Sequence, residues 1–147
     1  MNWVLLLEQT LNGFQFGILL FLLAAGLTLI FGIMDLINLA HGSLYMMGAY
    51  FAATFTQWTD SFLLGALLAL PACMLFGVIL ERIALRTLYT RSHLDQVLAT
   101  FGLILFFNEF VRLIWGPIGL DIPLPDLLSG SVELFFGIRY PAFRLVI

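Results

Sequence analysis

The chain has 147 residues, of which 62% are hydrophobic and only 10% are charged, and its formal net charge is −3. This composition excludes a disordered chain, because disordered chains contain few apolar residues. The sequence also lacks the excess of positive charge that binds a nucleic-acid backbone. The single cysteine, Cys73, excludes a disulfide framework and a cysteine-based zinc site, which leaves a polytopic membrane protein.

Long intervals without charge predict the membrane spans. No charged residue lies between Glu8 and Asp35, between Asp35 and Asp60, or between Asp60 and Glu81. Each interval is long enough for a helix of about 20 apolar residues, which crosses the hydrocarbon core. We therefore expect an all-α transmembrane helix bundle embedded in the lipid bilayer. The expected spans are residues 11–34, 36–58, 62–80 and 96–115, with the start of a fifth at 140–147.

Polar residues interrupt the chain between the first two spans, where Asp35, Asn38, His41 and Ser43 follow one another closely, together with Gly42. A tight turn explains them if Asp35 and Asn38 cap the helix that follows. A broken helix explains them if the polar groups line a cavity. We favour the cap for Asp35 and leave both roles open for Asn38 and His41. The candidate pathway residues of this segment are Asn38, His41, Gly42 and Ser43.

The third span carries a stripe of small residues at a spacing of four: Gly65, Ala69, Cys73 and Gly77. Residues spaced by four lie on one face of a helix. Small side chains on one face let a second helix approach closely, which is how helices associate in lipid. The stripe therefore predicts a helix-packing surface.

Arginines predict the orientation of the chain. Arg82, Arg86 and Arg91 lie in the short connection between the third and fourth spans, and the N-terminal tail has no positive charge. Positive charge in short loops marks the cytoplasmic side. The N-terminus is therefore expected outside, and residues 116–139 form an extracytoplasmic loop, with a short hairpin expected at 132–140.

The fourth span carries Asn108, Glu109 and Arg112. Glu109 and Arg112 are three residues apart on a helix, so we expect a structural ion pair. Asn108 is a further candidate pathway residue, with a hydrogen bond to a neighbouring helix as the alternative. Thr100, on the same span, has the same two interpretations.

The sequence contains no catalytic or nucleotide-binding motif. It lacks a GxxxxGK[ST] phosphate loop, a GxSxG elbow and an HExxH zinc motif. No other histidine or cysteine lies at ligand spacing from His41, so no metal site is predicted. We expect no enzymatic activity and no cofactor bound by this chain.

Several motifs resemble the permease subunits of branched-chain amino acid ABC importers, of the high-affinity leucine/isoleucine/valine type. The motifs are residues 26–32 (GLTLIFG), 37–42 (INLAHG), 45–50 (YMMGAY), 81–82 (ER), 98–103 (LATFGL) and 115–117 (WGP). Leu39 is a mild departure, because phenylalanine is commoner there. The resemblance covers the whole chain and corresponds to the N-terminal half of such a permease.

The resemblance implies a subunit of an ATP-driven, binding-protein-dependent importer in the bacterial cytoplasmic (inner) membrane, which forms part of the translocation pathway. Its implied partners are a second related permease, cytoplasmic ATPase subunits that bind the ATP, and a periplasmic or extracellular solute-binding protein. No nucleic acid is implied. The family's main ATPase-contacting loop lies further along such permeases. Two alternatives stay open: a urea or short-amide permease of the same superfamily, and a non-transporting membrane fragment or scaffold.

Overall fold

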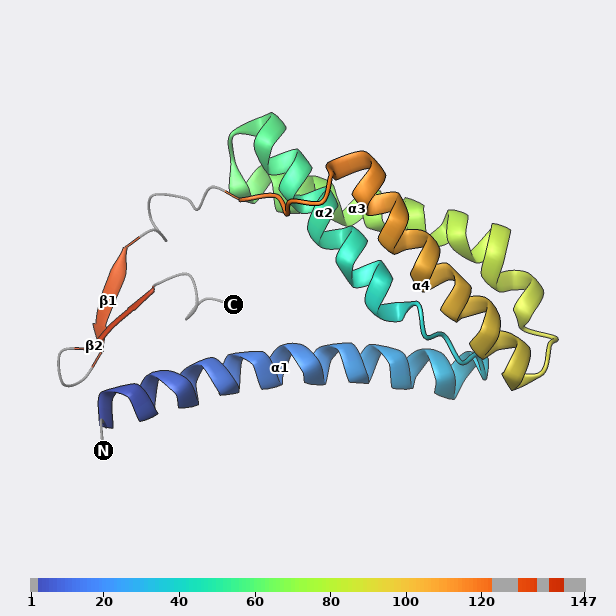
Figure 1. Ribbon diagram of the computed structural model, residues 1–147, viewed down its shortest axis with the longest axis horizontal. Helices are drawn as coiled ribbons and strands as arrows, with labels where there is room; N and C mark the ends of the chain where they lie inside the picture. Colours follow the sequence, from blue (N-terminus) through green and yellow to red (C-terminus); the bar gives the residue numbers. More distant parts are fainter. Residues whose placement is uncertain (1–2, 123–129, 135–137, 142–147) are drawn as a thin grey trace. The chain divides into compact units, whose positions relative to one another are not determined.

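The structure is a computed structural model that describes residues 3–122, 130–134 and 138–141. This part of the chain contains four α-helices and one β-hairpin (Figure 1). The helices are α1 (Trp3–Met34), α2 (His41–Thr59), α3 (Phe62–Leu80) and α4 (His93–Trp115). The hairpin pairs β1 (Ser131–Leu134) with the antiparallel β2 (Ile138–Pro141).

The predicted all-α membrane fold is confirmed. Within the described residues, three helices are long and apolar enough to cross a membrane: Trp3–Met34, Phe62–Leu88 and His93–Trp115. The segment Phe62–Leu88 is α3 continued by a π-helical turn (Glu81–Leu85) and a 3₁₀ turn (Arg86–Leu88). That α2, with its 19 residues, also crosses the membrane stays a prediction.

Three of the helices differ from the expected spans at their beginnings. The second begins at His41 rather than at residue 36, because residues 35–40 are not helical. The first begins at Trp3 rather than at residue 11, because the polar residues before it fit in a helix: the Thr10 hydroxyl donates to the Leu6 carbonyl at 2.7 Å. The fourth begins at His93 rather than at 96, because Ser92 caps it by accepting a hydrogen bond from the Asp95 N–H.

The residues near the C-terminus meet the expectations in part. The hairpin expected at 132–140 is present as β1 and β2, with Val132 opposite Tyr140. Residues 140 and 141 belong to β2 and not to a helix, and the rest of the expected fifth span lies outside the described residues. The side of the membrane on which the hairpin lies stays a prediction.

The chain divides into two compact units, residues 1–24 with 124–147 and residues 25–123. The second unit holds the packed core, to which residue 36, the first half of α2, the end of α3 with the turns after it, and the second half of α4 contribute. Its buried residues are Leu36, Met47, Leu80, Leu85, Leu88, Phe107 and Val111. Helices α2 and α3 form a tight hairpin, joined by Asp60 and Ser61. Asp60 adopts a left-handed φ of 50° that ends α2.

The connection between α3 and α4, residues 81–92, is called the arginine connection below. The side chains of Arg82, Arg86 and Arg91 are exposed. Within the connection, the Tyr89 hydroxyl donates to the Glu81 carboxylate at 3.2 Å. Desolvation, and then this hydrogen bond to a carboxylate, raise the pKa of Tyr89 above its usual value. The connection is therefore an ordered turn and not a loose loop.

Candidate functional site

Residues 35–40, called the unwound segment below, separate α1 from α2 and contain no helix. Asp35 adopts a left-handed φ of 50°, which ends α1 while its N–H still donates to the Phe31 carbonyl at 2.9 Å. Leu36, Asn38 and Ala40 are buried and alternate with more exposed residues. This alternation is typical of an extended chain packed on one side.

Helix α4 supplies the hydrogen-bond acceptors that the unwound segment lacks. The Ile37 N–H donates to the Gln96 amide oxygen at 2.9 Å, and the Leu39 N–H donates to the Thr100 hydroxyl at 3.2 Å. The Asn38 side-chain oxygen accepts from the Ala40 N–H at 3.0 Å. The protein itself thus satisfies the N–H groups of Ile37, Leu39 and Ala40, as non-helical backbone would require at membrane depth.

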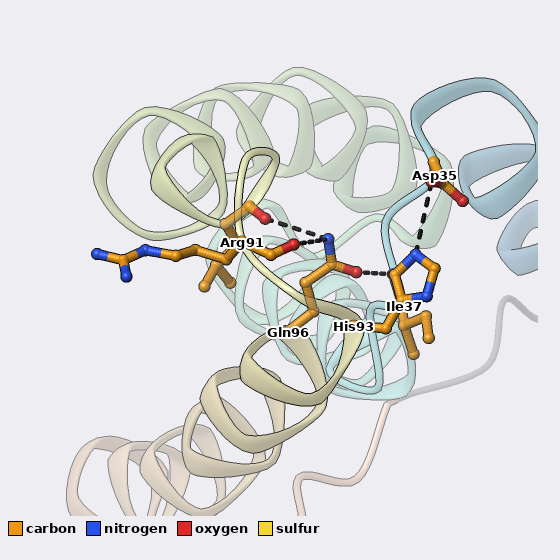
Figure 2. Close-up of polar contacts among 6 residues, drawn as sticks. Asp35, Ile37, Arg91, His93 and Gln96 are labelled. Atoms are coloured by element: carbon orange, nitrogen blue, oxygen red, sulfur yellow. Dashed lines mark hydrogen bonds and ion pairs between the residues drawn. The ribbon is translucent and has the colours of Figure 1, made fainter.

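Gln96 and Thr100 lie one turn apart on α4, and their exposed fractions are 1% and 0%. The Gln96 amide nitrogen donates to the carbonyls of Leu88 at 3.1 Å and Arg91 at 3.4 Å (Figure 2). Thr100 donates in turn to the Gln96 carbonyl at 2.7 Å. Sequence reasoning missed Gln96. The available signal was its spacing from Thr100, since two polar residues four apart on an apolar helix share one face.

The predicted capping role of Asp35 is wrong. The residue that precedes α2 is Ala40, and the Asp35 carboxylate lies 3.5 Å from the His93 Nε2 atom at the start of α4 (Figure 2). The physical reason is that the unwound segment is longer than a tight turn, so Asp35 is too far from α2 to reach its free N–H groups. Both side chains of this pair are more than half exposed, so it adds little stability.

His41 is the first residue of α2 and is half-buried. Its Nδ1 atom is buried and has no hydrogen-bond partner among the described residues. Gly26 of α1 faces the imidazole closely, since a Cβ atom there would lie 3.1 Å from the His41 Nε2 atom. The absence of a side chain at Gly26 therefore makes room for His41.

The other candidate pathway residues are placed differently. Ser43 is buried in the first turn of α2, whereas the neighbouring Gly42 is exposed. Asn108 is exposed on α4 and is not on the face that carries Gln96 and Thr100. The structure therefore does not bring Asn108 to the unwound segment. The pathway role of all these residues stays a prediction.

A pocket of about 340 Å³ lies between the last turns of α1 and the unwound segment. It is mainly apolar. Its lining residues are Leu27, Thr28, Phe31, Leu36, Ile37, Asn38 and Leu39. Apolar walls with a few polar groups are typical of pockets that bind small molecules.

The small-residue stripe faces α2 along its N-terminal part. Gly65 and Ala69 are buried, and a Cβ atom at Gly65 would lie 2.6 Å from the Thr56 backbone nitrogen. A Cβ atom at Gly48 of α2 would lie 3.3 Å from the Cys73 sulfur. Gly77 differs, because a Cβ atom there would meet no atom of another described element within 4 Å. The stripe thus contacts α2 at its Gly65 end, whereas its Gly77 end contacts no other described element.

The acidic and basic residues of the fourth span lie side by side. The Arg112 Nη1 atom is 3.2 Å from the Glu109 Oε1 atom, and both side chains are about two-thirds exposed, at 67% and 68%. An exposed pair three residues apart on a helix adds only a few tenths of a kcal/mol, roughly 0.2–0.5. The pair therefore offsets charge at the end of α4 without deciding the fold.

Comparisons with known proteins identify the family of the chain. Residues 9–124 match the family model described as "Branched-chain amino acid transport system / permease component". The permease protein LivH of the high-affinity branched-chain amino acid transport system of Salmonella typhimurium (strain LT2) is 33% identical to this chain. LivH of Escherichia coli (strain K12) is 31% identical, and BraD of Pseudomonas aeruginosa is 32% identical.

Each of these alignments covers 85% of this chain and 43% of the relative, so the chain spans less than half the length of the curated relatives it matches. No solved structure matches the chain. The family match covers most of the chain, including the unwound segment and α4. The resemblance seen in the sequence is therefore confirmed, and the chain belongs to the family of permease components of branched-chain amino acid transport systems.

Proposed function

We propose that this chain is part of a permease subunit that carries branched-chain amino acids across the bacterial cytoplasmic membrane. The observation that carries the proposal is the unwound segment between α1 and α2, whose backbone N–H groups bind Gln96 and Thr100 of α4. Transporters commonly place solute sites at interrupted helices, because unwound backbone near the membrane interior is expensive and is retained where it lines a cavity. Family membership supports the same interpretation.

The pocket beside the unwound segment supports the substrate class. Its walls include Leu27, Phe31 and Leu36, which suit a branched aliphatic side chain, and Thr28 and Asn38 add polar groups. A zwitterionic amino acid also needs polar partners or water for its charged ends. Our proposed pathway residues are Asn38, His41, Gly42 and Ser43 near the start of α2, and Asn108 further along the chain in α4.

The proposed assembly contains a second permease, cytoplasmic ATPase subunits and a solute-binding protein. ATP would bind to the ATPase subunits, and we assign no catalytic step and no cofactor to this chain. The N-terminus is proposed to lie outside the cell and the arginine connection inside it. The exposed side chains of Arg82, Arg86 and Arg91 support this orientation, because positive charge concentrates on the cytoplasmic side.

Uptake measurements test the proposal. Cells that carry the gene with its neighbouring transport genes, and matched cells that lack this subunit, receive labelled leucine or labelled urea. We expect leucine uptake to require the subunit and urea uptake to be independent of it. Uptake of urea alone would overturn the substrate class, and normal leucine uptake without the subunit would overturn the transport role.

A further inference from the structure

The side chain of Gln96 joins two parts of the chain that are far apart in sequence. Its amide oxygen accepts from the Ile37 N–H at 2.9 Å, and its amide nitrogen donates to the carbonyls of Leu88 and Arg91 at 3.1 and 3.4 Å. Only a donor faces the oxygen and only acceptors face the nitrogen, so these partners determine the orientation of the amide. Figure 2 shows the amide between the two segments.

The two segments belong to different parts of the fold. Ile37 lies in the unwound segment, beside the apolar pocket. Leu88 and Arg91 lie in the arginine connection, which continues α3 through a π-helical and a 3₁₀ turn. A buried side chain that satisfies backbone groups on both sides holds them at a fixed separation, because moving either one leaves a polar group unpaired.

Two other side chains in the first half of α4 also contact the unwound segment. His93, Gln96 and Thr100 lie on one face of α4 and contact every second residue of that segment, at Asp35, Ile37 and Leu39 in turn. The hydroxyl of Thr100 otherwise binds carbonyls of α4 itself. Gln96 adds the link to the arginine connection.

We propose that Gln96 is a positioning residue that locks the unwound segment to the arginine connection, so that the two move as one unit during transport. The transport part of this statement rests on the proposed function, whereas the locking rests on the hydrogen bonds alone. A displacement of the connection is then passed to the backbone beside the pocket.

Substitutions of Gln96 separate the two sides of the link. Glutamate still accepts from the Ile37 N–H, but it cannot serve both carbonyls of Leu88 and Arg91: the ionised form has no donor, and the protonated form that burial favours has a single O–H. Methionine keeps the length of the side chain and loses both functions, without adding charge. Gln57→Glu is the matched control, because it makes the same change at an exposed position near the end of α2.

The test is a distance measurement by pulsed electron paramagnetic resonance. Spin labels are attached to cysteines introduced by Leu39→Cys and Thr90→Cys, since both positions are exposed. Cys73 is replaced by alanine so that it takes up no label. The measurement uses the whole permease with its partner subunits bound. We expect one narrow distance distribution that is the same with and without ATP. Gln96→Glu and Gln96→Met should broaden it, whereas Gln57→Glu should not.

An unchanged width in both Gln96 variants would overturn the lock, and so would a wild-type distance that shifts when ATP binds. Leucine uptake tests the positioning role separately. Each Gln96 variant loses at least one buried hydrogen bond, and methionine loses all three. The maximal rate should therefore fall at least about fivefold, while KM stays close to the wild-type value. A wild-type maximal rate in a variant with a broadened distribution would overturn that role. If the intact complex carries no branched-chain amino acid, the proposed function fails, and the distance measurement still decides the lock.

Discussion

The substitution Gly65→Ala tests how closely α2 and α3 pack. Gly65 is buried near the start of α3, and an added Cβ atom would lie 2.6 Å from the backbone nitrogen and 2.7 Å from the Cα atom of Thr56. Backbone atoms cannot rotate away as a flexible side chain can. The two helices must therefore separate by about 1 Å to restore an ordinary contact of about 3.5 Å.

The size of the effect follows from two opposing terms. Overpacking of this kind costs about 1–3 kcal/mol. Replacing glycine by alanine inside a helix also stabilises the helix by up to about 1 kcal/mol. Gly77→Ala makes the same change on the same helix, where the new Cβ atom would meet no atom of another described element within 4 Å. The helix term is common to both variants, so their difference isolates the clash at about 1–3 kcal/mol.

The assay is the unfolding of the purified permease in mild detergent micelles as sodium dodecyl sulfate is added. Circular dichroism monitors the loss of helix. We expect Gly65→Ala to unfold at a lower mole fraction of the denaturing detergent than Gly77→Ala. If Gly65→Ala were as stable as Gly77→Ala, the close approach of α2 and α3 at this position would be refuted.

Three further predictions concern the site and the orientation of the chain. Thr100→Val removes the oxygen that accepts a backbone N–H of the unwound segment and should destabilise the protein by about 1–3 kcal/mol in the same assay. Thr100→Ser keeps that oxygen and should stay near wild type. Gly26→Ala should displace His41 and lower leucine uptake with a normal amount of protein in the membrane, whereas Gly32→Ala, in open space, should leave uptake unchanged. Cysteine at Thr90 should react with an impermeant maleimide only from the cytoplasmic side, and labelling of intact cells would contradict the topology.

The helices follow from local features of the sequence. The apolar run from Phe62 to Leu80 coincides with α3, because Ser61 and Glu81 bound an uninterrupted apolar stretch. The beginnings of α1 and α4 were less predictable. The hydroxyl of a polar residue such as Thr10 can donate to a carbonyl of its own helix, so it need not end the helix. A cap such as Ser92 is recognised only once the helix direction is known.

The roles of individual polar residues depended on partners from distant parts of the chain. Asp35 looked like a cap when it was read with its sequence neighbours, and the structure places it beside His93. Gln96 was not predicted as a site residue, although its amide oxygen accepts from the N–H of Ile37, 59 positions away. Its spacing from Thr100 marks a polar face, but the spacing does not say what that face binds.

The sequence by itself determined the class of the protein. Apolar runs of spanning length require helices in lipid, because no water is present there to satisfy an open backbone. The match of residues 9–124 to the family model gives the family. Only the tertiary structure decided which side chains satisfy the unwound segment and which part of the small-residue stripe touches α2. The composition and periodicity of a segment are enough to predict its helix. These contacts depend instead on how α4 lies against residues 35–40 and how α3 lies against α2.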